Sequence, residues 1–351
     1  MVTLMVRAVR GLLLCTPSAF AVGCAHGSNA SIRRDRIAPA IRMTAVSPRV
    51  TLEVLDWGGR GPALVFLAGL GNTGHVYDTF APQFTDRFHV LGITRRGFGA
   101  SSGSPPPNSL DTLVADITAT LDTLGLRQVV LVGHSIAGEE MTRFAELHGT
   151  RCAGLIYLDA AYDRSGIDTL VLHQPAQPAP TIRAADLASL TSLRALYARV
   201  MGVDEPESDI RAITRFDADG RPQDKVTADS LQARIASGKQ VARYDQIHCR
   251  ALALYAVPDS VADVVPYYAE LDAAGRGQAD SLLKFVQRVV AESRARIAPF
   301  PQNQIVDVHG SNHYLFLQHP RDVAAAMRAF LSSDSVPQRP KRTLKLPKDR
   351  Y

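Results

Sequence analysis

Short apolar runs alternate with helical patterns along most of this chain. Predicted strands lie at residues 50–56, 63–68, 88–93, 128–132, 154–158, 251–256 and 304–308. Predicted helices lie at residues 109–125, 137–148, 281–297 and 320–332. Many of the runs are rich in Val, Ile and Leu without polar interruption, as strands buried on both faces are. The alternation therefore predicts an α/β fold with a mostly parallel central sheet flanked by helices. The turn at residues 58–62 is expected to join the first two strands as a hairpin.

One long segment interrupts this alternation. Residues 163–248 contain a proline-rich stretch at 174–180 and no convincing strand. Helical patterns in this segment lie near residues 184–201, 206–215 and 228–237. We interpret the segment as a helical cap inserted between two strands of the core. The core then comprises residues 48–162 and 249–333.

Positive charge gathers at the two ends of the chain. The 351 residues include 39 Lys and Arg against 34 Asp and Glu, a formal net charge of +5. Residues 1–47 and 337–351 each carry six basic residues and one acidic residue, so the body between them has a net charge of −5. A nucleic-acid-binding domain needs a basic face on its folded part. We therefore predict no nucleic-acid partner and interpret residues 334–351 as a solvated basic tail.

The first 24 residues have the pattern of an export signal. Arg7 and Arg10 precede a modest apolar run, and small residues precede Cys24. The run Phe20-Ala21-Val22-Gly23-Cys24 is similar to a bacterial lipoprotein box, which would make Cys24 a lipid-modified membrane tether. Cleavage after Ala21 with simple secretion is the alternative, and a chance apolar start is a third. Residues 25–47 suit a linker, and we expect a periplasmic, membrane-anchored or secreted protein.

Two cysteines remain in the predicted core. Cys152 and Cys249 each precede an apolar run by three residues. If those runs are neighbouring parallel strands, the two cysteines lie at the same level of the sheet. An oxidising compartment would then permit a disulfide. Two small buried thiols are an equally good interpretation.

The run Gln128–Gly138 predicts a buried strand, a tight turn and a helix, with Ser135 in the turn. A serine hydroxyl is a poor nucleophile unless it is held exposed beside a base. The helix that follows supplies backbone N–H groups and the positive end of its dipole to a developing oxyanion. Small residues at positions 133, 137 and 138 would let so sharp a turn pack against neighbouring strands. We therefore predict Ser135 as a nucleophile.

Gly133-His134-Ser135-Ile136-Ala137 resembles the G-x-S-x-G turn of the α/β-hydrolase superfamily, with Ala in place of the last Gly. The resemblance covers roughly residues 50–332 and is to its capped bacterial serine esterases. Phe66–Asn72 resembles the family's H-G-x-G loop, with Ala68 in place of His. By this resemblance the N–H groups of Leu70 and Ile136 form the oxyanion hole. Thr94–Ser101 resembles the family's D-x-R-G-x-G-x-S loop, which we interpret as structural.

The family's chain order of Ser, then Asp or Glu, then His implies a base late in the sequence. His313 lies in a loop after the last predicted strand, where the family has G-x-x-H, and is the predicted base. His309 is interpreted as a strand-end side chain. His134 is interpreted as structural, with possible access to the pocket. His75 lies near the oxyanion loop and could touch the substrate.

The acid that orients the histidine has three candidates. Asp259 follows the strand after the cap and matches the family's usual spacing, so it is our prediction. Asp159 ends the preceding strand, where some members carry the acid, and Asp263 is a third choice. Each could instead cap a loop. Glu139 and Glu140 follow the nucleophile and are interpreted as favourable charge in the first turn of a helix.

The resemblance implies a serine hydrolase that cleaves a small-molecule carboxylic ester through an acyl-enzyme. Other chemistry of the same fold is the first alternative: amide, thioester, lactone or C–C hydrolysis, or cofactor-free peroxidase or lyase activity. A ligand-binding protein on the same scaffold is the second. The sequence contains no clustered metal ligands, phosphate-binding loop or dinucleotide fingerprint, so we predict no cofactor and no metal.

Overall fold

The structure is a computed structural model that describes residues 38–103, 105–165, 174–238, 240–300 and 303–332. The predicted signal at residues 1–24 and the basic tail at 334–351 lie outside the described residues. Within the described part, no helix is both long and apolar enough to cross a bilayer.

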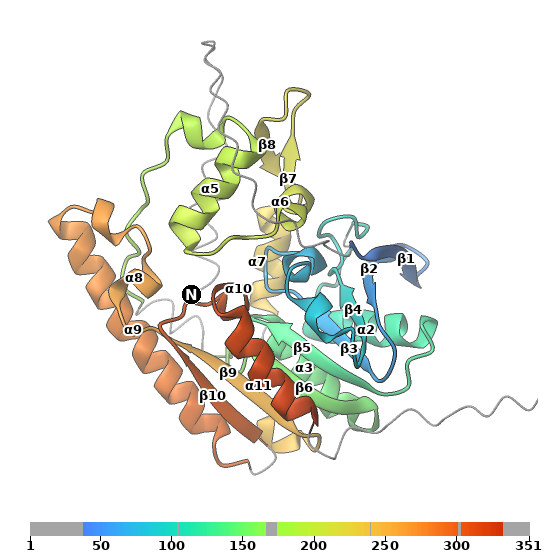
Figure 1. Ribbon diagram of the computed structural model, residues 1–351. Coiled ribbons are helices and arrows are strands. Elements are labelled where there is room, and N and C mark those ends of the chain that lie inside the picture. The colour runs from blue at the N-terminus through green and yellow to red at the C-terminus, as the bar shows by residue number, and fades with distance from the viewer. Residues whose placement is uncertain (1–37, 104, 166–173, 239, 301–302, 333–351) are drawn as a thin grey trace, which may run out of the picture.

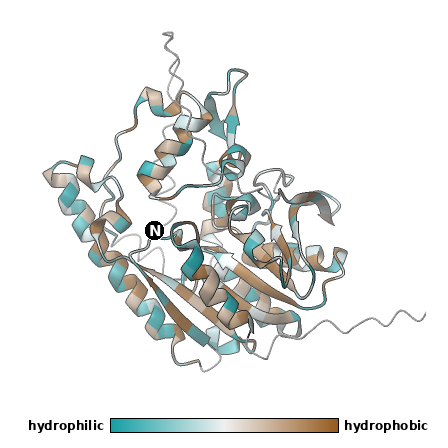
Figure 2. Ribbon diagram, viewed as in Figure 1, coloured by the Kyte–Doolittle hydropathy of each residue, from teal (hydrophilic) through white to brown (hydrophobic). Residues whose placement is uncertain are grey.

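An eight-stranded sheet organises the fold (Figure 1). Its strands are β1 (Ala40–Ser47), β2 (Val50–Gly58), β3 (Ala63–Leu67), β4 (His89–Ile93), β5 (Val129–His134), β6 (Cys152–Leu158), β9 (Ala251–Val257) and β10 (Asn303–His309). Their order is β1-β2-β4-β3-β5-β6-β9-β10, and only the pairs β1/β2 and β2/β4 are antiparallel. The parallel strands therefore end at one common edge, from β4 to β10. Figure 2 shows the central strands in the hydrophobic colour, as their burial on both faces requires.

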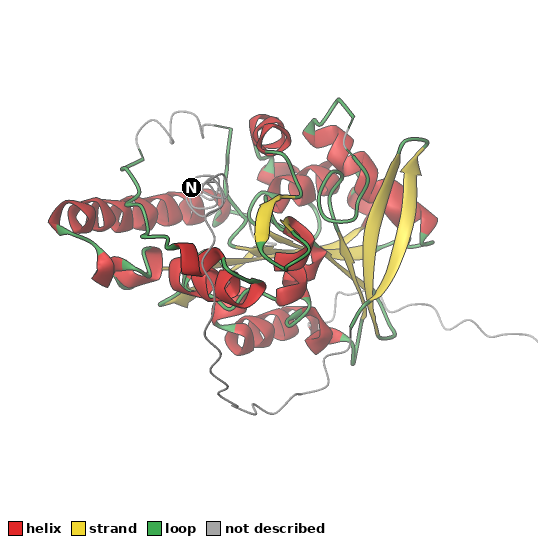
Figure 3. Cartoon of the chain, turned by 90° about the horizontal axis from the view of Figure 1, so that it is seen from above, coloured by secondary structure: helices red, strands yellow, loops and turns green. Residues whose placement is uncertain are grey.

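Helices cover both faces of this sheet (Figure 3). The longer ones are α2 (Leu110–Thr123), α3 (Ala137–Leu147), α9 (Ala273–Ile297) and α11 (Pro320–Ser332). The shorter ones are η1 (Gly74–Tyr77), η2 (Ala81–Phe84), η3 (Gly149–Arg151), η5 (Tyr244–Gln246), α8 (Val261–Val264), η6 (Tyr268–Glu270) and α10 (Leu315–Gln318). Helix α9 begins eight residues before the predicted start, because Asp272 caps it by accepting a hydrogen bond from the N–H of Gly275.

The cap lies over the carboxyl ends of the strands (Figure 1). It contains η4 (Ala184–Leu187), α5 (Leu190–Met201), α6 (Glu207–Ile213) and α7 (Asp229–Ser237). It also contains a small antiparallel pair, β7 (Thr214–Phe216) and β8 (Pro222–Lys225), so the expectation of a cap without strands is wrong. Each of these strands is at most four residues long and neither is an apolar run, which is why the pattern did not reveal them.

Two expectations at the start of the core are also wrong. Residues 40–47 of the predicted linker form β1, which pairs with β2 as an antiparallel hairpin. Only part of β1 is buried, so its sequence lacks the apolar signal of a core strand. The first two predicted strands, now β2 and β3, are not paired, because β4 inserts between them. Which strand pairs with β2 depends on β4, a strand later in the chain, and a local turn signal cannot indicate this.

Cys152 and Cys249 are joined by a disulfide, with their Cα atoms 6.0 Å apart. Strands β6 and β9 are parallel neighbours, with Leu155 opposite Ala251, so both cysteines lie at the same end of the sheet. The bond closes a loop with a sequence separation of 97 that contains the whole cap. In the chain-entropy account, closing a loop of this size stabilises a fold by up to about 4.7 kcal/mol. Such a bond persists in an oxidising compartment, in keeping with the export predicted from residues 1–24.

Candidate active site

Ser135 stands in a strained turn between β5 and α3. Its φ of 58° lies in the left-handed region, which a serine adopts only when its surroundings impose it. The turn requires small neighbours: a Cβ at Gly138 would lie 2.0 Å from the carbonyl oxygen of Ala160, and one at Gly133 would lie 2.6 Å from Sδ of Met141. The prediction that small residues permit this turn is therefore confirmed.

His313 and Asp159 form a hydrogen-bonded pair at the same edge of the sheet. Nδ1 of His313 lies 2.6 Å from Oδ2 of Asp159, and both side chains are buried. A carboxylate can only accept, so Nδ1 donates and the neutral imidazole carries its lone pair on Nε2. Among the described residues, Nε2 has no hydrogen-bond partner. The arrangement therefore presents a free basic nitrogen.

Three further hydrogen bonds hold Asp159 in place, two at its carboxylate and one at its backbone N–H. Its Oδ1 accepts a hydrogen bond of 2.5 Å from the hydroxyl of Tyr162 and one of 3.1 Å from the N–H of Ala256. Its own N–H donates to the carbonyl of Leu254 on β9. With a φ of 46°, Asp159 turns the chain sharply at the end of β6. The acid is therefore fixed by its own strand, by β9 and by Tyr162.

The prediction that Asp259 orients the histidine must be corrected. Asp259 pairs instead with His309 at 2.9 Å, and the two side chains are 57% and 65% exposed. Asp263 accepts hydrogen bonds from the N–H groups of Asp259 and Ser260, so it caps a loop. Sheet order explains the difference. Strand β6 lies directly beside β5, whereas β9 lies one strand further away, so Asp159 is the carboxylate nearer the nucleophile turn.

His134 contacts the loop that carries His313. It is fully buried, and its Nε2 lies 2.9 Å from the carbonyl oxygen of His313, with the two ring centroids 4.4 Å apart. Burial lowers the pKa of His134 well below its usual value, and the charge of His313 lowers it further. His134 is therefore neutral and donates through Nε2, which confirms its interpretation as a structural residue.

Arg95 braces the loop expected to form the oxyanion hole. Its guanidinium donates to the carbonyl of Ala68 at 2.9 Å and to Glu140 of α3 at 2.8 Å, and both charged side chains are buried. Burial raises the pKa of Glu140, and the positive charge of Arg95 opposes that rise. The amides of Leu70 and Ile136 make no hydrogen bond within the described residues.

The cap holds two loops of this site. The amide nitrogen of Asn72, in the oxyanion loop, donates to Oδ2 of Asp209 on α6 at 2.7 Å. The side-chain amide of Asn312, beside the base, donates to the carbonyl of Met201 on α5 at 2.8 Å. The side chains of Leu70 and Ile136 also pack in one small apolar cluster with residues of α7. The position of the cap therefore constrains the loops that carry Asn72 and Asn312.

His75 lies between two carboxylates and contacts both. Its Nδ1 lies 2.8 Å from Asp78 and its Nε2 lies 3.4 Å from Glu53. Burial lowers the pKa of His75, but hydrogen bonds and charge interactions with Asp78 and Glu53 raise it to about 10 overall. Burial of Glu53 is likewise outweighed, mainly by His75, so the pKa of that carboxyl is lowered. Both ring nitrogens of His75 therefore face carboxylates, and its contact with a substrate stays a prediction.

This raised pKa predicts a loss of stability in alkaline solution. The contribution of His75 is fully present below its usual pKa of 6.5 and is lost as the pH rises through about 10. The free energy of unfolding should fall across that range by at most about 1.4 kcal/mol per pH unit. Urea denaturation at pH 7 and pH 9.5 measures the change in the wild type and in His75→Gln. The free energy of unfolding of the variant should fall by less between the two pH values. Equal falls in the two proteins would contradict the raised pKa of His75.

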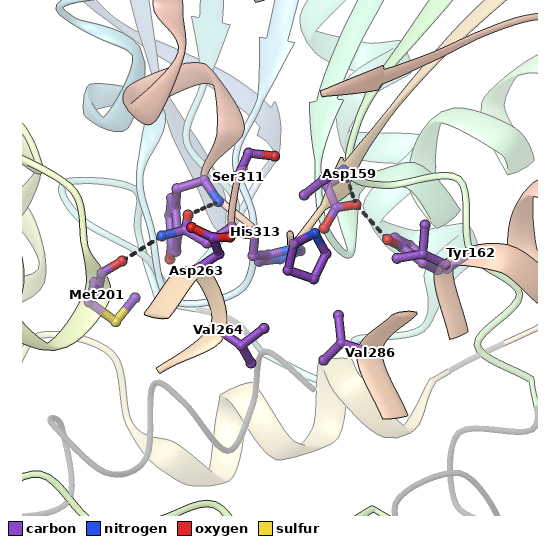
Figure 4. A pocket seen from close by; sticks show the side chains of 13 residues that line it. Asp159, Tyr162, Met201, Asp263, Val264, Val286, Ser311 and His313 are labelled. Carbon is purple, nitrogen blue, oxygen red and sulfur yellow. Dashed lines mark hydrogen bonds and ion pairs between the residues drawn. The ribbon is translucent and has the colours of Figure 1, made fainter. Parts of the chain in front are cut away.

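A cavity with about 480 Å³ of empty space, including open solvent, borders the His313–Asp159 pair (Figure 4). Val264 and Val286 form part of its apolar wall, and Tyr162 lies on the side of Asp159. Ser135 does not line it, so the cavity adjoins His313 and Asp159 more closely than Ser135. Among the described residues, no three His, Cys, Asp or Glu side chains group together in a way that could hold a metal ion.

Several residues of the site escaped the sequence analysis. Tyr162 follows Asp159 by three residues, and a polar aromatic residue just beyond a strand-terminal acid is the signal that could have found it. Arg95 stood in a loop recognised as structural, but its contact with Glu140 joins separate elements and has no local signature. The contact between Asn72 and Asp209 spans 137 residues and depends wholly on the seating of the cap.

Known proteins resemble parts or most of this chain. The sequence model of a family described as alpha/beta hydrolase fold matches residues 62–211. The 2-(acetamidomethylene)succinate hydrolase of Mesorhizobium japonicum is 24% identical over 293 residues, which cover 81% of this chain and 93% of that protein. Epoxide hydrolase B of Mycobacterium tuberculosis is 29% identical over 111 residues, 31% of each chain. The crystal structure of E-2-(acetamidomethylene)succinate hydrolase matches with a TM-score of 0.61 and 19% identity, covering 84% of this chain and 99% of that chain.

Proposed function

Because this chain belongs to the α/β-hydrolase superfamily, we propose that it is a serine hydrolase that cleaves a carboxylic ester through an acyl-enzyme. One observation carries the proposal: the buried His313–Asp159 pair lies at the sheet edge where Ser135 occupies its strained turn. Strand order supports it, because β5 and β6 are neighbours and His134 packs directly against His313.

The proposed reaction uses each group in turn. Nε2 of His313 takes the proton of Ser135 while the serine oxygen bonds to the substrate carbonyl carbon. The N–H groups of Leu70 and Ile136 stabilise the negative charge on the carbonyl oxygen, and each such donor is worth about 2.7–4 kcal/mol. The C–O bond to the alcohol breaks as His313 returns the proton to the leaving oxygen. Water, deprotonated by His313, then releases the acid and regenerates Ser135.

Asp159 has a positioning role in this scheme. Its hydrogen bond to Nδ1 holds the imidazole in the tautomer with a basic Nε2 and stabilises the imidazolium formed in each half-reaction. The cavity beside the pair suits the leaving alcohol, since His313 must protonate that group and the walls at Val264 and Val286 are apolar.

Removal of the nucleophile tests the proposal. Ser135→Ala should abolish covalent labelling by a fluorophosphonate and hydrolysis of p-nitrophenyl esters of increasing chain length. Loss of a catalytic serine costs on the order of 10⁶-fold in kcat. Ser281→Ala, at an exposed position of α9, is the matched control and should be labelled and active as the wild type is. Equal labelling of Ser135→Ala and the wild type would refute the role of Ser135.

Amide hydrolysis is a second candidate function. The relative from Mesorhizobium japonicum, which aligns over nearly its whole length, is named for hydrolysis of an acetamido derivative of succinate. The same groups could expel an amine, because His313 would protonate a leaving nitrogen as it would a leaving oxygen. Comparison of kcat/KM for matched acyl esters and acyl amides decides which substrate class the site prefers.

A further inference from the structure

Arg164 lies five residues beyond Asp159, where the chain leaves the sheet edge. Its guanidinium stacks 5.4 Å from the ring centre of Tyr162, and the hydroxyl of Tyr162 donates to Asp159. Tyr162 also lines the cavity beside His313 (Figure 4). Tyr162 therefore contacts both this guanidinium and the acid of the proposed triad.

The cation of Arg164 has no carboxylate partner among the described residues. Its Nη1 is buried and makes no hydrogen bond there. The other arginines near the site differ, since Arg95 pairs with Glu140 and Arg96 pairs with Asp116 at 2.5 Å. A buried donor without a partner is costly, and a ligand that supplies an acceptor would remove that cost.

The positive charge of Arg164 also acts on His134, a buried residue of the site. Burial, the charge of His313 and the charge of Arg164 all lower the pKa of His134, the residue next to Ser135. A single guanidinium matches one negative charge, and Asp159 nearby would disfavour a doubly charged group. Arginine presents its donors as a planar fork that fits a carboxylate, and stacking on an aromatic ring fixes that plane.

We propose that Arg164 binds a carboxylate of the substrate, so that the natural substrate is a carboxylate-bearing ester or amide and not a neutral one. This inference rests on the proposed function and adds a specificity-determining residue to it. The carboxylate lies on the Tyr162 side of the cavity, while the scissile carbonyl lies at Ser135. Binding replaces the missing partner of Nη1 with a charged hydrogen bond.

Charged and neutral esters test this assignment. p-Nitrophenyl hemisuccinate carries a carboxylate on the acyl side, 4-carboxyphenyl butyrate carries one on the alcohol side, and p-nitrophenyl butyrate is neutral. A charged hydrogen bond is worth about 1.5–3 kcal/mol, so Arg164→Gln should lower kcat/KM about 10- to 100-fold for at least one charged ester. The value for the neutral ester should change by less than about threefold.

Arg234→Gln is the matched control, because Arg234 is an exposed cation on α7 of the cap. It should leave the preference for charged over neutral esters unchanged. An equal loss in both variants would assign the effect to long-range charge and would overturn the role of Arg164. Unchanged selectivity in Arg164→Gln would overturn it as well.

Succinate binding separates this inference from the proposed function. Calorimetric titration of succinate into Ser135→Ala measures anion binding without turnover, and Arg164→Gln in that background should weaken it about tenfold or more. If no ester is hydrolysed but succinate binds through Arg164, the proposed function fails and the anion site stands. If esters are hydrolysed but neither succinate binding nor selectivity depends on Arg164, the anion site fails alone.

Discussion

Asp159→Asn is expected to lower kcat by about 10⁴-fold, whereas Asp259→Asn should leave kcat within about twofold of the wild type. The amide of asparagine would offer Nδ1 of His313 a donor or a neutral acceptor in place of a carboxylate. The imidazole would then lose its preferred tautomer and the charge that stabilises its protonated form. Steady-state hydrolysis of p-nitrophenyl butyrate measures both variants.

The two substitutions form a matched pair. Each changes a carboxylate that contacts a histidine, but only Asp159 contacts His313, whereas Asp259 contacts the exposed His309. Asparagine tolerates the left-handed backbone at position 159, where φ is 46°, so the turn itself should persist. The opposite result, a large loss in Asp259→Asn with little change in Asp159→Asn, would reassign the acid to Asp259.

Glu140→Ala should destabilise the fold by about 3–5 kcal/mol, because it leaves the buried charge of Arg95 without its partner. It should also lower kcat, since Arg95 holds the carbonyl of Ala68 and thereby the loop that carries the N–H of Leu70. Thermal and urea denaturation measure the first effect, and ester hydrolysis below the unfolding transition measures the second.

A double variant separates these two effects. In Arg95→Met with Glu140→Met, both charges of this buried pair are removed together, so neither is left without its partner and much of the lost stability should return. The activity should not return, because the bridge that Arg95 and Glu140 form between the oxyanion loop and α3 is then absent. If activity returns together with stability, Arg95 matters only to folding and the proposed link to the oxyanion loop is wrong.

Local pattern was sufficient for most of the framework and for the prediction of Ser135 in its turn. Each run predicted as a strand in the core corresponds to an observed strand, namely β2, β3, β4, β5, β6, β9 or β10. Strands β3, β5, β6 and β9 are almost wholly buried, and burial on both faces selects a largely apolar sequence. Ser135 could be found because its strand, turn and helix are contiguous in the chain. His313 was predicted from the resemblance, because the family's chain order and its G-x-x-H loop place the histidine after the last strand.

The acid, the edge strand and the supporting ion pairs were decided by tertiary pairing. Asp159 and Asp259 each end a parallel strand, and only the placement of β6 beside β5 makes the first the partner of His313. Strand β1 exists because β2 offers it a hydrogen-bonding edge, although few of its own side chains are buried. Local periodicity indicates which side chains are buried. Contacts between distant segments depend instead on which strands lie side by side in the sheet.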